Sequence, residues 1–151
     1  MRLVIAALMT VAPLTLTGCG QPSGPAAVSV SGATINLPAV RGRPAAGYFE
    51  LQPTTDQGAL TSVTSPQAQR IEMHETVQNG GVSSMRAMNR VAIEDGKPIS
   101  FRPGGRHLML FGLDPSLEPG KEMELTFHFE KGEPVKTIAK LQPPGGGHAA
   151  H

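Results

Sequence analysis

The stretch Glu122-Met123-Glu124-Leu125-Thr126-Phe127-His128-Phe129 (residues 122–129) alternates polar and apolar side chains with a strict period of two. Successive side chains of a β-strand point to opposite faces of a sheet, so this pattern predicts a strand with one buried and one solvated face. His128 falls on the solvated face, where we expect an ordinary surface histidine. The chain is therefore predicted to contain a sheet that covers a core on one side.

Seven further segments have strand-like patterns, and Gly, Pro, Asn or Asp residues separate them at short intervals. The predicted strands are 33–37, 46–51, 70–78, 82–88, 98–102, 107–111 and 135–141. The 18 glycines and 14 prolines among 151 residues also favour short strands and turns over long helices. Only a short helical turn within 114–118 is expected. The sequence thus predicts an all-β fold, either a sandwich or a small barrel.

The overall composition excludes several classes of function. Thirteen Lys and Arg balance 12 Asp and Glu, which argues against nucleic acid or an anionic membrane surface as the main partner. A single Cys permits neither an intramolecular disulfide nor a thiolate metal cluster, whereas seven Met and five His are present. Ser83 and Ser84 lie near His74 in sequence but lack an acidic third member, so no hydrolase is predicted and the protein is not expected to be an enzyme.

The first eighteen residues have the pattern of a secretory signal. Arg2 supplies the positive start, and the apolar stretch 3–16 that follows is short and interrupted by Pro13. Such a stretch is too short to span a bilayer as a stable helix. We therefore predict that 1–18 directs export.

The end of this segment, Leu16-Thr17-Gly18-Cys19, resembles the lipobox of bacterial lipoproteins, in which cleavage precedes a cysteine that receives lipid. Lipidation of Cys19 would anchor the protein to a membrane in the periplasm. Gly20, in place of Asp, favours the outer membrane under the usual sorting pattern. The alternative is ordinary cleavage, which would leave Cys19 as a spare thiol.

Composition divides the rest of the chain into three parts. Residues 19–27 are predicted to be the lipidated Cys and a flexible tether, 28–141 a single β domain, and 142–151 a disordered tail rich in Gly, Pro and His. His148 and His151 in this tail are either a weak capture site for Cu(II) or part of a polar terminus without a function.

A predicted hairpin brings one histidine close to one methionine. Asn79-Gly80 is a strong signal for a two-residue turn, and that loop would place His74 directly opposite Met85. Opposed Cβ atoms lie about 4.5–5.5 Å apart, close enough for both side chains to share one ion. A three-residue loop would instead pair His74 with Arg86. The other face of this hairpin is predicted to be core: Ile71, Met73, Val77, Val82 and Met88.

A third strand adds a second such pair. The turn at 103–105 precedes His107 and Met109, which point to the same face because they are two residues apart on a strand. Neutral thioethers favour Cu(I), and imidazole binds metal only when neutral, so affinity should weaken below roughly pH 6.5. A blue-copper electron carrier would need a cysteine thiolate, which the mature domain lacks. The pattern therefore predicts a Cu(I) site with two His and two Met.

The spacing of these residues resembles that of a known family. Ten residues separate His74 from Met85, twenty-one separate Met85 from His107, and one separates His107 from Met109. This matches the H-x10-M-x21-H-x-M motif of the periplasmic copper chaperones called PCu(A)C. Two surrounding segments also resemble that family: 72–75 and 103–110.

The resemblance implies a cupredoxin-like Greek-key β-sandwich that binds Cu(I) through His74, Met85, His107 and Met109. It also implies delivery of copper to the copper subunit of cytochrome c oxidase, directly or with a Sco-type thiol protein. Two alternatives remain open. One is a periplasmic copper buffer or resistance lipoprotein without a dedicated acceptor, and the other is a structural lipoprotein whose His and Met residues belong to the core.

Overall fold

The computed structural model describes residues 28–146, apart from 55–56 and 95. The predicted export signal, lipidation site, tether and tail histidines lie outside these residues: 1–18, Cys19, 19–27, His148 and His151. In the described part of the chain no helix is long and apolar enough to cross a membrane.

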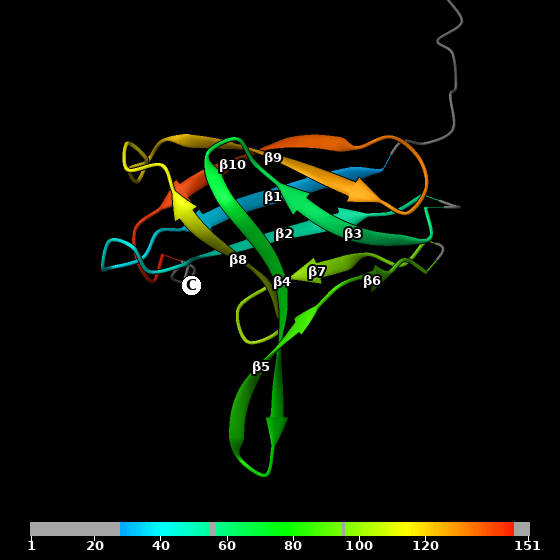
Figure 1. Ribbon diagram of the computed structural model, residues 1–151. Helices are drawn as coiled ribbons and strands as arrows, with labels where there is room; N and C mark the ends of the chain where they lie inside the picture. The colour runs from blue at the N-terminus through cyan, green and yellow to red at the C-terminus, as the bar shows by residue number, and fades with distance from the viewer. Residues whose placement is uncertain (1–27, 55–56, 95, 147–151) are drawn as a thin grey trace, which may run out of the picture.

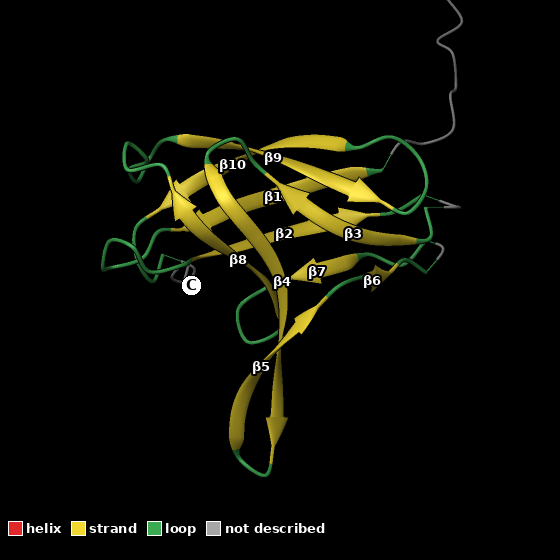
Figure 2. Ribbon diagram, in the orientation of Figure 1, coloured by secondary structure: helices red, strands yellow, loops and turns green. Residues whose placement is uncertain are grey.

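All regular structure in the described residues is β-strand (Figures 1 and 2). The strands in chain order are β1 (Ser29–Asn36), β2 (Ala45–Gln52), β3 (Ala59–Thr64), β4 (Ala68–Asn79), β5 (Val82–Met88), β6 (Val91–Ala92), β7 (Ile99–Phe101), β8 (Arg106–Leu113), β9 (Glu122–Phe129) and β10 (Val135–Gln142). The all-β prediction is confirmed. Eight of these strands overlap the predicted segments, whereas β3 and β6 were not expected.

The strands form one sheet with the order β5-β4-β8-β2-β1-β10-β9-β3-β6. Strand β7 is outside this order and pairs with residues 49–51 of β2, next to residues 45–47, which pair with β8. Neighbouring strands are antiparallel except for β1 and β10, which run parallel. The sheet curls over so that β3 packs against β4, which turns it into a two-layered sandwich (Figure 1). Strand β10 ends at Gln142, the first residue of the predicted tail, which pairs with Asn36.

The interior is filled by alternate side chains of both layers. Phe49 stacks on Phe101 with ring centroids 4.3 Å apart and meets Phe127 edge-on at 4.8 Å. Met123, Leu125 and Phe127 of β9 are fully buried, as the period-two pattern predicts. Met73 is also buried, and Met88 packs against the core from its margin, as expected for both, whereas Val82, which was predicted to be core, is 69% exposed, so the prediction is wrong there.

Strands β4 and β5 extend beyond the sandwich as a two-stranded arm (Figure 1). The first part of β4, 68–75, pairs with β8, and its later part, 73–79, pairs with β5. Strand β5 is at the edge of the sheet, and every residue of it except Met88 is exposed. The arm is therefore joined to the sandwich where β5, β4 and β8 lie side by side, over residues 73–75 of β4.

The turn at the tip of the arm corrects the predicted register. Asn79 pairs with Val82, so the loop consists of Gly80 and Gly81, with φ of 56° and 84°. Both central residues of a type I′ turn need positive φ, which two glycines adopt without the steric cost that a side chain brings. His74 consequently faces Ala87, and the predicted pairing of His74 with Met85 is wrong, as is its alternative with Arg86.

The corrected register preserves the face on which each side chain lies. Met85 pairs with Thr76, two residues along β4 from His74. Because side chains alternate along a strand, a shift of two residues keeps Met85 on the same face as His74. The two residues are diagonal neighbours, a relation in which long side chains still reach one another across about 7–8 Å.

Candidate metal centre

Two histidines from distant parts of the chain face each other across β4 and β8. His74 pairs directly with His107, and their ring centroids are 6.0 Å apart with an angle of 32° between the rings. His107 is buried, with 7% of its surface exposed, and the His74 side chain is 14% exposed. The long β4–β8 pairing therefore holds two imidazoles side by side at a mostly dry position where the arm begins.

Hydrogen bonds set the protonated nitrogen of each ring. His107 Nδ1 lies 3.1 Å from the Gly105 carbonyl, which can only accept, so Nδ1 carries the proton and Nε2 keeps its lone pair. The same carbonyl accepts a hydrogen bond from the Thr76 amide at 3.1 Å. His74 donates from Nε2 to Glu72 Oε2 at 2.9 Å, which leaves the lone pair on Nδ1.

The Nδ1 atom of His74 is buried and has no hydrogen-bond partner among the described residues. Most buried polar atoms have a partner, so an orphaned imidazole nitrogen is a candidate position for a bound ion. An ion bound at this nitrogen would satisfy it. In the described part of the chain, each histidine thus has one nitrogen held by a hydrogen bond and a second whose lone pair could bind an ion.

The two methionines flank this pair on the same face of the sheet. Met109 lies two residues beyond His107 on β8 and pairs across the strands with Glu72, so it is one diagonal neighbour of His74. Met85, on the arm, is the other diagonal neighbour and is 64% exposed. The structure therefore brings His74, His107 and Met109 together on the sandwich and places Met85 beside them on the arm.

The Glu72 carboxylate that contacts His74 is itself held in place by Arg70. Glu72 Oε1 lies 3.0 Å from Arg70 Nε, and the Arg70 guanidinium lies over the Phe111 ring at 4.4 Å. The hydrogen bond from His74, helped by the positive charge of Arg70, holds the pKa of Glu72 below its ordinary value. Glu72 is therefore an ionised acceptor that fixes the orientation of the His74 ring.

The donor set is chemically soft. The described residues contain no group of three or more His, Cys, Asp or Glu side chains placed to hold a metal. Met85 and Met109 offer neutral thioether sulfur on the same face as the two imidazoles, and thioether with imidazole is a combination that suits Cu(I). The sequence predicted no role for Glu72 beyond its place in the segment 72–75. Its position two residues before His74, on the same face of a strand, was the available signal.

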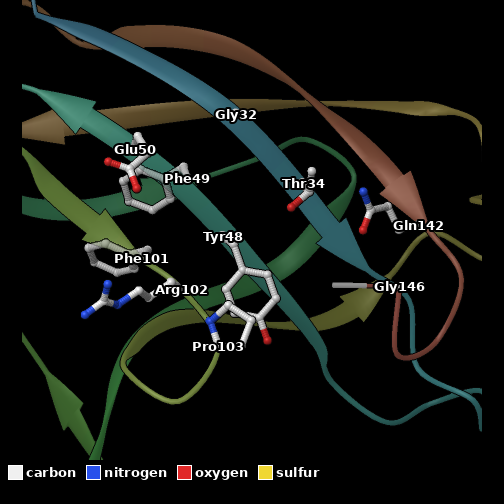
Figure 3. Close-up of a pocket in the computed structure, with 10 residues that line it drawn as sticks. All are labelled: Gly32, Thr34, Tyr48, Phe49, Glu50, Phe101, Arg102, Pro103, Gln142 and Gly146. Carbon is white, nitrogen blue, oxygen red and sulfur yellow. The ribbon is translucent and has the colours of Figure 1, made fainter. Parts of the chain in front are cut away.

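A shallow pocket of about 240 Å³ lies elsewhere, against the outer face of β1 and β2 (Figure 3). Tyr48, Thr34 and Arg102 contribute polar groups to it, and burial raises the pKa of the Tyr48 hydroxyl. None of the four candidate ligands lines this pocket. This pocket is therefore separate from the histidine and methionine cluster at the base of the arm.

Comparison with known sequences identifies a family. The model of a family described as "Putative lipoprotein LpqE-like" matches residues 28–140. "Putative lipoprotein Lxx21020" of Leifsonia xyli subsp. xyli is 30% identical over 140 residues, covering 87% of this chain and 84% of that protein. "Uncharacterized protein RP573" of Rickettsia prowazekii is 30% identical over 112 residues, covering 73% of this chain and 58% of that protein.

Solved structures with the same fold carry the PCuAC name. The copper-bound PCuAC domain from PmoF2 superposes with a TM-score of 0.64 at 19% identity, covering 78% of this chain and 93% of that domain. The Cu(I) form of DR1885 from Deinococcus radiodurans has a TM-score of 0.62 at 24% identity, covering 78% and 79%. The predicted cupredoxin-like fold and the resemblance to PCu(A)C proteins are thereby confirmed. This chain belongs to the LpqE-like family and has the fold of a PCuAC domain.

Proposed function

We propose that this protein is a copper chaperone that binds Cu(I) through His74, Met85, His107 and Met109 and passes it to another protein. The observation that carries the proposal is the facing pair of histidines, in which each ring has one nitrogen held by a hydrogen bond and one free. Structures of the same fold described as copper-bound and as Cu(I)-bound support it.

In this proposal the ion is bound by His74 Nδ1 and His107 Nε2, with thioether sulfur from Met109 on the sandwich and from Met85 on the arm. Met85 is 64% exposed, so it is the ligand that an acceptor protein can displace first. Copper would then pass through an intermediate shared by both proteins, in a direction set by their relative affinities. The reaction is ligand exchange, and it requires no catalytic residue.

The location of the protein is part of the proposal. Membership of a family described as lipoproteins supports attachment to the cell envelope through Cys19. We place the domain in the periplasm, with the outer membrane favoured by Gly20. Metabolic labelling with a radioactive fatty acid tests the anchor, and label retained in the Cys19→Ser variant would refute it.

The proposed recipient is the copper subunit of cytochrome c oxidase, reached directly or through a Sco-type protein. Deletion of the gene at limiting copper should lower oxidase activity, and added copper should restore it. Unchanged oxidase activity together with greater sensitivity to copper would favour a copper buffer over a chaperone. Cu(II) binding by His148 and His151 is a separate proposal, which removal of residues 147–151 tests by Cu(II) titration.

A competition titration against a chromophoric Cu(I) chelator under anaerobic conditions tests the binding site itself. The protein should remove Cu(I) from the chelator at one ion per chain, and His107→Ala and Met109→Ala should each bind more weakly. Variants that compete as well as the unchanged protein would overturn the site.

A further inference from the structure

A carboxylate between two guanidiniums lies on the face of the sheet opposite the proposed copper ligands. Glu75 of β4 pairs with Arg86 of β5 on one side and with Arg106 of β8 on the other. Arg86 Nη2 donates to Glu75 Oε2 at 2.8 Å, and Arg106 Nε lies 3.9 Å from Glu75 Oε1. These three residues, which we call the charge ladder, connect the three strands that meet at the base of the arm.

Each member of the charge ladder is the chain neighbour of one proposed ligand. Glu75 follows His74, Arg86 follows Met85, and Arg106 precedes His107. Because successive side chains of a strand point to opposite faces, the charge ladder lies directly behind the ligands. A residue of the charge ladder can therefore restrain the backbone of the neighbouring ligand without contact with the ion.

Along β4 the charge ladder also lies between the His74–His107 pair and the Thr76–Met85 pair. Along β4, Glu75 separates His74, which faces His107, from Thr76, which faces Met85. Glu75 is the last residue of β4 that pairs with β8, and beyond it the Thr76 amide still donates to the Gly105 carbonyl. The last β4–β8 pair, and with it the base of the arm, therefore lies at the level of Glu75.

We infer that Glu75, Arg86 and Arg106 are positioning residues that hold the arm so that Met85 reaches the ion bound at His74 and His107. The inference rests on the proposed function and adds to it a control of affinity from behind the site. The Glu75 side chain is 28% exposed, against 40% for Arg106 and 69% for Arg86, so water partly screens the ladder. Removal of the charge ladder should make the arm more mobile and leave the sandwich folded.

The test is the Cu(I) competition titration of the Glu75→Gln variant, which keeps the shape of the side chain and removes its charge. Partly exposed ion pairs of this kind imply a loss of affinity of about 1.5-fold to fivefold. The matched control is Glu124→Gln, which removes the charge of Glu124 from its 2.9 Å ion pair with Lys136 on distant strands and should leave Cu(I) affinity unchanged. Affinity of Glu75→Gln equal to that of the unchanged protein would overturn the inference.

A double-mutant cycle separates positioning of Met85 from a general loss of structure. If the charge ladder acts through Met85, Glu75→Gln should weaken Cu(I) binding in the unchanged protein and have no further effect in Met85→Ala. Equal losses in both backgrounds would contradict this. Arg86→Gln should behave as Glu75→Gln does, and Arg86→Lys, which keeps the charge, should restore most of the affinity.

The metal-free protein gives a readout that does not depend on the proposed function. Amide hydrogen exchange over 82–86 should be faster in Glu75→Gln than in the unchanged protein, whereas exchange over 122–129 should be the same in both. Unchanged amide hydrogen exchange over 82–86 in Glu75→Gln would overturn the inference about the charge ladder even if the protein binds Cu(I). Failure of the unchanged protein to bind Cu(I) would overturn the proposed function, and exchange would still decide the role of the ladder.

Discussion

Replacement of Glu72 by Ala should weaken Cu(I) binding although Glu72 is not a proposed ligand. Its carboxylate accepts a 2.9 Å hydrogen bond from His74 Nε2 and is held in turn by Arg70 Nε at 3.0 Å. Loss of such an outer contact to a metal-binding histidine costs about 10- to 100-fold in affinity. Because the Glu72 side chain is 35% exposed, water can replace part of the contact, and we expect a loss of about tenfold.

The assay is competition for Cu(I) with a chromophoric chelator, combined with ¹⁵N chemical shifts of the His74 ring in the metal-free protein. In the unchanged protein the shifts should report the proton on Nε2, and in Glu72→Ala a mixture of both tautomers. Glu72→Gln keeps an oxygen that can accept from Nε2 and should lose less affinity. The matched control is Glu124→Ala, whose side chain has a similar exposure of 37% and an equally short contact with Lys136. Unchanged affinity and tautomer in Glu72→Ala would refute the reasoning.

Three further predictions concern the sandwich and the arm. Gly47→Ala would place a Cβ atom 2.9 Å from Ile35 Cδ1 and 3.1 Å from Leu108 Cβ, so it should lower the free energy of unfolding in urea by about 1–3 kcal/mol; no change would show that the core can yield at this point. Gly81→Ala has open space around it but a φ of +84°, so it should cost about 1–2 kcal/mol in the same assay, and a neutral effect would contradict the type I′ turn. Met85→Ala, at an exposed position, should change the free energy of unfolding by less than about 0.5 kcal/mol and still weaken Cu(I) binding; a large loss of stability would assign Met85 to the core.

The strands that local patterns identify are those with a regular period or a clear turn. Strand β9 follows its alternation closely, because Met123, Leu125 and Phe127 all point into the core. Strand β3 was missed because its sequence, ALTSVT, has no regular period, and it is a strand through its pairing with β9 and β6. Tertiary pairing thus determines the strands for which local propensity is weak.

The site was predicted as a set of residues but not as a geometry. The spacing of His and Met identified four candidates, and the structure places all four on one face of neighbouring strands. The direct pairing of His74 with His107 depends on long-range contact between β4 and β8, for which the sequence holds no local signal. The hairpin register was missed because Asn79-Gly80-Gly81 contains two overlapping turn signals that share Gly80, and in the structure Gly81 rather than Asn79 is the second turn residue.

Glu72, Glu75 and Arg86 show what kind of residue a motif search overlooks. Glu72 contacts His74 along the same strand, whereas Glu75 and Arg86 pair across strands, a contact that can be assigned only once the register is known. In the proposed site the ligands would define which ion is suitable. We expect the surrounding charged residues to determine how firmly each ligand is held, so that substitutions there change affinity without loss of the site.

X-ray absorption spectroscopy of the Cu(I)-loaded protein is the measurement that tests the proposed His and Met site most directly. We predict a copper environment that contains both imidazole nitrogen and thioether sulfur, with the sulfur contribution reduced in Met109→Ala and Met85→Ala. A copper shell of nitrogen or oxygen alone, or a spectrum that neither Met109→Ala nor Met85→Ala changes, would contradict the proposed site.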